Sequence, residues 1–262
     1  DSVDQWSAAG QKNIFGNQVK VVEMESEAGA AGAVHGSLGA GAVTTTFTAS
    51  QGLLLMIPNM YKIAAEQLPC VFDVSARTVA TQSLNIFGDH SEVMDLSPVA
   101  HLAAIEGKVP FLNFFDGFRT SHEYQKIEKW DYADLKEMCN MEAVEEFRKK
   151  ALNPEHPKMR GSHENGDVFF QHREACNSVY NALPAVVEKY MGKINEKLGT
   201  NYDLFNYYGA PDADRVVVCM GSFCDVLEEV IDYLNAHGEK VGLVKVRLFR
   251  PFSIKHFVDV LP

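Results

Sequence analysis

The sequence predicts an α/β protein built on a doubly wound, mainly parallel sheet. Short β-branched or apolar runs alternate with segments of helical pattern through the first half of the chain, as is typical of parallel sheets with helices on both faces. The pattern then resets near residue 200, where strand and helix patterns begin again. We therefore expect a first domain with a C-terminal helical arm over 1–200, and the start of a second α/β domain over 201–262.

The first unit is organised around the Ala/Gly-rich block 26–43, a predicted helix between strands at 19–24 and 43–48. The five glycines of this block each cost roughly 1 kcal/mol relative to Ala in a free helix, so tertiary packing has to hold the helix. A helix without bulky side chains lets another backbone, or a flat ligand, approach closely.

The remaining elements follow in the same alternation. In the first domain we predict a helix at 50–66 that is kinked or restarts at Pro58, a strand at 69–75, a loop before a helix at 99–106, and a strand at 109–115. In the arm we predict a long amphipathic helix at 132–152, a polar extended stretch at 158–167, and a helix at 177–198. In the second domain we predict a strand at 215–220, a helix at 224–237 capped by Gly238, a strand at 241–246, and a final helix capped by Ser253.

Glu27 is the first candidate site residue. It follows the strand predicted at 19–24 and stands at the start of the Ala/Gly helix, at the sheet edge where open α/β sheets bind ligands. The alternative is that this carboxylate only complements the helix dipole. The glycines do not follow the G-x-G-x-x-G spacing of a dinucleotide site, which excludes that fingerprint.

Composition narrows the partners and the compartment. The net charge of −11 without a basic cluster argues against nucleic acid and anionic membranes as partners. Five scattered cysteines without a C-x-x-C pair favour a reducing compartment, the cytoplasm, and show no zinc or iron–sulfur site in this segment. We find no apolar run of membrane-spanning length and no signal peptide. The first residue is not Met, so we expect part of a longer polypeptide.

Several long blocks resemble a known family. Residues 26–36, 44–62, 87–90 and 114–123 resemble the N-terminal part of pyruvate:ferredoxin or pyruvate:flavodoxin oxidoreductases, and 246–252 resembles their following domain. The resemblance implies the thiamine-diphosphate-binding fold. On this basis, 1–200 is the pyrimidine-side domain for thiamine diphosphate, and 201–262 opens a domain like the transketolase C-terminal domain.

The resemblance also implies an activity and partners. The family decarboxylates pyruvate oxidatively with coenzyme A, yielding acetyl-CoA and CO2, and passes two electrons through 4Fe-4S clusters to ferredoxin or flavodoxin. Thiamine diphosphate with Mg2+ is its catalytic cofactor. The clusters and coenzyme A are expected on the remaining domains of the same polypeptide, which forms a homodimer. We therefore expect this segment alone to be inactive. The alternatives are another 2-oxoacid:ferredoxin oxidoreductase, or a scaffold without a ligand of its own.

The resemblance assigns a role to two residues, Glu27 in cofactor activation and Arg77 in substrate binding. Glu27 matches the glutamate that hydrogen-bonds the aminopyrimidine ring nitrogen. Sharing a proton with that nitrogen promotes the imino tautomer that accepts the thiazolium C2 proton, and burial against an Ala/Gly wall favours the protonated carboxyl group. Arg77 matches the arginine that holds the pyruvate carboxylate with its planar guanidinium. Without the resemblance, Arg77 reads as a surface arginine at a strand end.

We interpret the other polar residues near the predicted site as structural rather than catalytic. The loop with Asp116, Arg119, His122 and Glu123 is interpreted as structural or interface-forming, and only secondarily as close to substrate. His35 and His90 are expected to be satisfied by local hydrogen bonds rather than to act in catalysis. Glu23 and Glu25 are expected to face solvent or other strands.

The chain departs from the family pattern in two places. The family begins with an additional strand and a Pro-Ile-Thr-Pro-type turn, which is not found here. It also has a longer segment before the helix that starts near Met94, whereas here residues 91–93 join the two parts directly. A crossover between parallel strands needs a dozen or more residues. We therefore expect unobserved residues or a deletion at this junction.

Overall fold

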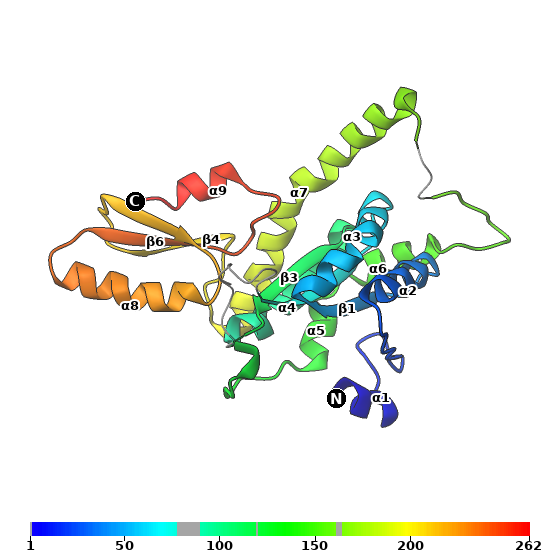
Figure 1. Cartoon of the computed structure of the whole chain (residues 1–262), viewed down its shortest axis with the longest axis horizontal. Helices are drawn as coiled ribbons and strands as arrows, with labels where there is room; N and C mark the ends of the chain where they lie inside the picture. Colours follow the sequence, from blue (N-terminus) through cyan, green and yellow to red (C-terminus); the bar gives the residue numbers. More distant parts are fainter. Residues whose placement is uncertain (1, 78–89, 119, 161–163) are drawn as a thin grey trace.

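The computed structural model describes residues 2–77, 90–118, 120–160 and 164–262, without the side chains of residues 90 and 91. Its first sheet has three parallel strands in the order β1 (Thr44–Ala49), β2 (Cys70–Ala76) and β3 (Phe111–Asp116). Helices α2 (Glu27–Gly39) and α3 (Ser50–Ala65) pack on one face, and α4 (His90–Gly107) packs on the other (Figure 1). The doubly wound α/β fold predicted from the sequence is confirmed.

The central strand β2 is buried on both faces. Phe72 and Val74 pack in one core cluster with Leu38 of α2 and with Met56 and Ile63 of α3. On the opposite face, the neighbouring residue Val71 packs against Ala100 and Ala104 of α4. A strand enclosed in this way needs a nearly continuous apolar sequence, and the sequence of β2, CVFDVSA, has a single charged residue.

That charged residue, Asp73, joins all three strands through hydrogen bonds. Its carboxylate accepts from the Thr45 hydroxyl of β1 at 3.2 Å and from the Asn113 amide of β3 at 2.9 Å. The same Asn113 amide group donates to the Ser97 hydroxyl of α4 at 2.8 Å. Since a slip of one residue would turn Asp73 into the apolar α2–α3 face, this network fixes the register of the sheet.

A second sheet contains three strands in the order β4 (Phe205–Gly209), β6 (Val241–Val246) and β5 (Arg215–Cys219). Strand β5 is parallel to β6 and is linked to it by α8 (Phe223–Ala236), while β4 is antiparallel to β6. Helix α9 (Ile254–Asp259) follows. The predicted βαβ unit is confirmed, but β4 was not predicted. Its five residues show no alternation of buried and exposed positions, so only pairing with β6 reveals the strand.

The helical arm differs from the prediction at two points. The single helix predicted at 132–152 is wrong, because α5 (Tyr132–Met138) ends before Asn140 and α6 (Met141–Lys149) begins after it. The Asn140 side chain accepts a hydrogen bond from the Ala143 amide at 3.1 Å and caps α6. Helix α7 (Gly166–Leu198) begins well before residue 177, and its N-terminal turns project away from both sheets (Figure 1). Its first turns are solvent-exposed and therefore lack an amphipathic pattern.

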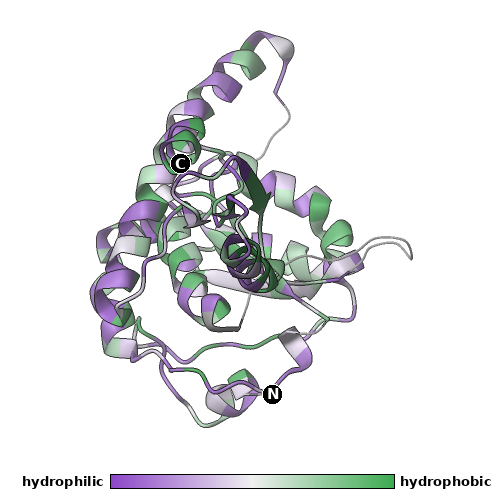
Figure 2. Ribbon diagram, turned by 90° about the vertical axis from the view of Figure 1, so that its left-hand side faces the viewer, coloured by the Kyte–Doolittle hydropathy of each residue, from purple (hydrophilic) through white to green (hydrophobic). Residues whose placement is uncertain are grey.

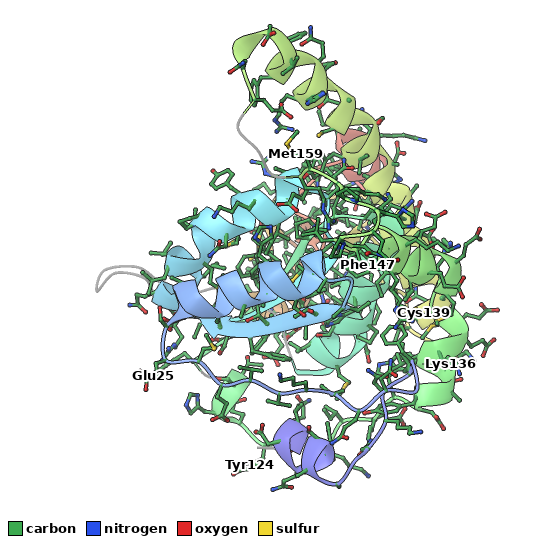
Figure 3. The ribbon with its side chains drawn as sticks, turned by 90° about the vertical axis from the view of Figure 1, so that its right-hand side faces the viewer. Glu25, Tyr124, Lys136, Cys139, Phe147 and Met159 are labelled. Carbon is green, nitrogen blue, oxygen red and sulfur yellow. The ribbon has the colours of Figure 1, made fainter. Side chains whose placement is uncertain are left out.

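The strand predicted at 19–24 is also wrong. These residues form no described strand, and Figure 3 shows the chain running apart from β1 before it reaches Glu25. Val22 and Met24 are 59% and 48% exposed, and the Val19 carbonyl accepts from the Ser7 hydroxyl at 2.6 Å rather than from a strand. A β-branched run forms a strand only where a neighbouring strand edge is available. The preceding residues contain the short helix α1 (Ser2–Ala8), and the 3-10 turn η1 (Thr120–His122) follows β3.

The two sheets share one apolar core through α7. Val187, Tyr190 and Ile194 of α7 belong to the same cluster as Phe205 of β4 and Val244 of β6. Figure 2 shows hydrophobic and hydrophilic residues alternating along the helices, as expected for helices with one buried face. Within the described residues, no helix is long and apolar enough to cross a membrane.

Gly117 provides a test of the packing after β3. Its amide donates to the Ala76 carbonyl at 2.7 Å, and a Cβ here would lie 2.6 Å from the Ser75 carbonyl carbon. Backbone cannot yield to this contact, so we expect Gly117→Ala to lower the free energy of unfolding in urea by about 1–3 kcal/mol. Gly192→Ala is the control, because a Cβ there has no neighbour within 4 Å and a helical Gly-to-Ala change stabilises by up to about 1 kcal/mol. Equal effects of the two changes would contradict this account.

Candidate functional site

The candidate site lies at the carboxyl edge of the first sheet, where β1 passes into α3 and β2 ends. Glu27 is the first residue of α2 and is half-buried, whereas Glu23 and Glu25 are exposed. The Ser26 side chain makes no capping hydrogen bond at the start of α2. Glu27 is thus the acidic group of the first helical turn, where a negative charge is favoured by the helix dipole.

Gly52, in the first turns of α3, lets the Glu27 side chain lie against the α3 backbone. A Cβ on Gly52 would stand 2.7 Å from Glu27 Cγ, 2.8 Å from Glu27 Oε1 and 2.5 Å from Thr48 Oγ1. Real Cβ contacts are longer than this, so only glycine leaves room for the carboxylate in its present place. The close contact between α2 and α3 thus depends on Gly52 of α3, whereas the glycines of the Ala/Gly helix itself have no neighbour closer than 3.5 Å to their Cβ positions.

Thr48 supplies an unsatisfied polar atom beside this carboxylate. Its Oγ1 is buried and has no hydrogen-bond partner within the described part of the chain. Buried hydroxyl groups are nearly always hydrogen-bonded, so an unpaired one asks for an explanation such as a ligand or a bound water. Thr48 and Gly52 were not predicted as site residues, although both fall in the block 44–62 that carries the family resemblance.

Ser50 links the ends of β1 and β2. It is buried and has a φ of +36°, a strained value for a residue other than glycine. Its hydroxyl accepts a hydrogen bond from the Arg77 amide at 3.0 Å, which fixes the first residue after β2. The Arg77 side chain is exposed, and its guanidinium forms no hydrogen bond or ion pair with the residues that the structure describes.

The polar loop after β3 has a structural role at Asp116. Its carboxylate accepts hydrogen bonds from the Phe118 amide at 2.8 Å and from the Thr120 hydroxyl at 3.3 Å. His122 bonds the Phe118 carbonyl through Nδ1 at 2.7 Å and is exposed, as is Glu123. These contacts fit the structural interpretation of the loop. The prediction for Arg119 lies outside the described residues.

His35 is satisfied locally, as predicted. Its Nε2 lies 2.8 Å from Glu66 Oε1, and Arg160 approaches the other Glu66 oxygen at 3.9 Å. Arg160 also donates to the Gly39 carbonyl at 3.1 Å, so this cluster fastens the arm to the end of α2. The side chain of His90 lies outside the described residues.

Two buried cysteines, Cys70 and Cys224, are poor nucleophiles. All five cysteines are free, and burial raises the pKa of Cys70 to about 12 and the pKa of Cys224 to about 12. A thiol with such a pKa is protonated at neutral pH and therefore unreactive.

Comparison with known families identifies the chain. The sequence model described as "Pyruvate flavodoxin/ferredoxin oxidoreductase, thiamine diP-bdg" matches residues 1–97 and 91–192. The chain belongs to the pyruvate flavodoxin/ferredoxin oxidoreductase family. A second model, pyruvate:ferredoxin oxidoreductase core domain II, matches residues 213–261.

Curated relatives agree with this family membership. The chain is 58% identical over 281 residues to a pyruvate-flavodoxin oxidoreductase of Enterobacter agglomerans, covering 100% of this chain and 24% of that protein. It is 58% identical to a pyruvate:ferredoxin oxidoreductase of Moorella thermoacetica, covering 99% of this chain and 24% of the relative. It is 52% identical to a pyruvate dehydrogenase [NADP(+)] of Cryptosporidium parvum, and the match covers 99% of this chain and 14% of that protein. The chain thus spans about a quarter or less of these relatives.

A solved structure agrees with the fold. The 2-oxoglutarate:ferredoxin oxidoreductase from Magnetococcus marinus, solved with 2-oxoglutarate, coenzyme A and succinyl-CoA bound, superimposes with a TM-score of 0.57. The match covers 94% of this chain and 48% of that one at 18% identity. At this identity the likeness supports the α/β fold and carries nothing about substrate.

The family model is that of a thiamine-diphosphate-binding domain. The chemistry of the described residues is compatible with such a group: a carboxylate at a helix start and an unpaired, buried Thr48 hydroxyl are both able to form hydrogen bonds with a heterocycle.

The role of Gly52 can be tested without any cofactor. We expect Gly52→Ala to displace the Glu27 carboxylate, because the new Cβ would overlap Cγ and Oε1. The carboxyl 13C resonance of Glu27 should shift in NMR spectra, while the free energy of unfolding falls by about 1–3 kcal/mol. Gly36→Ala in α2 is the control, since nothing lies within 4 Å of its Cβ position. A Glu27 resonance that stays in place in Gly52→Ala would contradict the contact.

Proposed function

We propose that this chain is the thiamine-diphosphate pyrimidine-side part of an enzyme that oxidatively decarboxylates pyruvate with coenzyme A. In this proposal the whole enzyme produces acetyl-CoA and CO2 and passes electrons through 4Fe-4S clusters to ferredoxin or flavodoxin. The observation that carries the proposal is the half-buried Glu27 carboxylate against Gly52 and beside Thr48, in a chain of this family. The remaining domains would supply the clusters, the coenzyme A site and the Mg2+-pyrophosphate site.

The chemistry assigned to this chain is proton sharing and substrate orientation. When bound, thiamine diphosphate supplies the carbanion that attacks the keto carbon and accepts the electron pair released with CO2. Glu27 would hold a proton between its carboxyl oxygen and the pyrimidine ring nitrogen, and the α2 N-terminus would favour the carboxylate once that proton has moved. Ser50 would hold the backbone of Arg77 so that the guanidinium can pair with the carboxylate of pyruvate.

The division of the chain belongs to the same proposal. We assign 1–200 to the pyrimidine-side domain with its arm and 201–262 to the beginning of the next α/β domain. A homodimer in the cytoplasm is proposed for the full-length enzyme, and the free cysteines support a reducing compartment.

The electron acceptor is proposed to be set outside this segment. Relatives named for flavodoxin, ferredoxin and NADP(+) are 58%, 58% and 52% identical to it. Because similar segments occur in proteins named for three acceptors, residues elsewhere in the polypeptide should choose among them. The substrate is tested separately, by measuring ferredoxin reduction by the full-length polypeptide with pyruvate and with 2-oxoglutarate. Preference for 2-oxoglutarate would overturn the assignment to pyruvate.

We expect Glu27→Gln in the full-length polypeptide to lower kcat by about 100-fold or more, the usual scale for a lost proton-transfer group. The amide keeps the shape of the side chain but cannot share the proton, so circular dichroism and thermal unfolding should change little. Glu25→Gln is the matched control, because Glu25 is exposed two residues away. Near-normal turnover of Glu27→Gln would exclude the role of Glu27 and favour a scaffold without a ligand.

We expect Arg77→Ala to raise the KM for pyruvate about 10- to 100-fold, because a hydrogen-bonded ion pair with the substrate carboxylate is lost. Arg77→Lys should recover only part of this loss, since an ammonium group cannot form a bidentate pair. Arg173→Ala, at an exposed position of α7, should leave KM unchanged. An unaltered KM in Arg77→Ala removes this residue from the substrate site.

A further inference from the structure

An apolar cavity of about 780 Å3 lies on the α4 side of the first sheet, away from Glu27. Its wall includes Val93, Met94 and Pro98 of α4 and Phe115 of β3, together with Trp6 and Trp130. The space opens to solvent, because Trp6, Ile127 and Tyr132 in its wall are 40%, 41% and 37% exposed. A contiguous apolar surface exposed in this way is typical of an interaction site.

The comparisons place a length difference at the same part of the chain. The family model matches in two pieces, 1–97 and 91–192, that meet in residues 91–97. The chain has 262 residues, yet its alignment with the Enterobacter agglomerans relative extends over 281, so 19 positions of that relative have no counterpart here. Val93 and Met94, which line the cavity, fall within this junction.

We propose that the cavity is the seat of the segment of about 19 residues that the relatives carry at this junction. The occupant is thus an apolar polypeptide segment, continuous with the beginning of α4. The wall favours it over a polar or charged ligand, because apolar side chains line most of it. The polar side chains near the α4 wall are already engaged, since Ser97 accepts from Asn113 at 2.8 Å and His101 lies 3.7 Å from Asp73.

The two tryptophans make the proposal measurable. The chain contains two Trp residues, and both Trp6 and Trp130 line the cavity. Intrinsic tryptophan fluorescence therefore reports on this space alone. The Trp130 indole donates to the Met94 carbonyl at 3.1 Å, so its emission should respond to a segment that enters beside Met94.

The decisive experiment grafts the missing segment of the Enterobacter agglomerans relative into the junction of this chain. We expect a blue shift of tryptophan emission, loss of the fluorescence of the apolar dye ANS, and a rise in Tm of more than about 4 °C. A Gly/Ser insertion of the same length is the control and should produce none of these changes. If both insertions give the same emission and the same Tm, the proposal is overturned.

Two point variants locate the effect. Ile127 lines the cavity and is 41% exposed, so Ile127→Arg should be tolerated while it removes at least half of the gain in Tm of the grafted protein. Ile254→Arg on α9, where the side chain is 72% exposed, should leave the gain intact. A gain that survives Ile127→Arg unchanged would overturn the assignment of the cavity.

If the grafted protein does not fold, titration of the unaltered chain with the segment as a synthetic peptide decides the question. A saturable blue shift, weakened at least tenfold by Ile127→Arg, supports the proposal. No saturable change, or the same change with a scrambled peptide, overturns it. A small apolar compound that co-purifies with the chain and is not displaced by the peptide would also overturn it, by identifying the cavity as a small-molecule site.

Discussion

The close approach of two helices at the sheet edge is the constraint on which the rest of the site depends. The first residue of α2 reaches the backbone of α3 because position 52 has no side chain. Any larger residue would push the Glu27 carboxylate outward, into water. Ala31, Val34 and Leu38 of α2 are buried in the core beneath it. The place of the carboxylate is therefore set by the packing of α2 on the sheet and by the missing side chain at position 52.

Much of this architecture was predictable because it depends on local patterns. Among the described residues, five of the six strands, the Ala/Gly helix and the position of Glu27 at its start follow from β-branched runs and from small residues between them. The exceptions are instructive. Residues 19–24 have a strand-like sequence but no described partner strand, whereas the weakly patterned β4 is a strand because β6 pairs with it. Pairing between strands distant in sequence is not encoded in either segment alone.

The site was predictable only in part, for a similar reason. Arg77 was proposed from its place after a strand that forms, β2, and from family resemblance. Glu27 was proposed from the same resemblance and from a strand at 19–24 that is not found, so only its place at the start of α2 is confirmed. Thr48 and Ser50 could not be singled out, because a threonine and a serine at a strand end are common. Their significance lies in an unpaired buried hydroxyl and in a positive φ, which are properties of the folded chain. The Asn140 cap that divides the helix predicted at 132–152 was missed in the same way, since its sequence fits a continuous helix equally well.

The passage of α7 through both halves of the molecule has a consequence for how the chain loses its structure. Val187, Tyr190 and Ile194 of α7 lie in one core with Val99 and Leu102 of α4 and with Phe205 and Val244 of the second sheet, so this helix joins the outer side of the first unit to the second sheet. Proteolytic cleavage near residue 200 would therefore expose an apolar surface on each fragment, and both fragments would tend to aggregate. The C-terminal half of α7 is part of the common core rather than a flexible linker, and the two units should therefore unfold in one cooperative step.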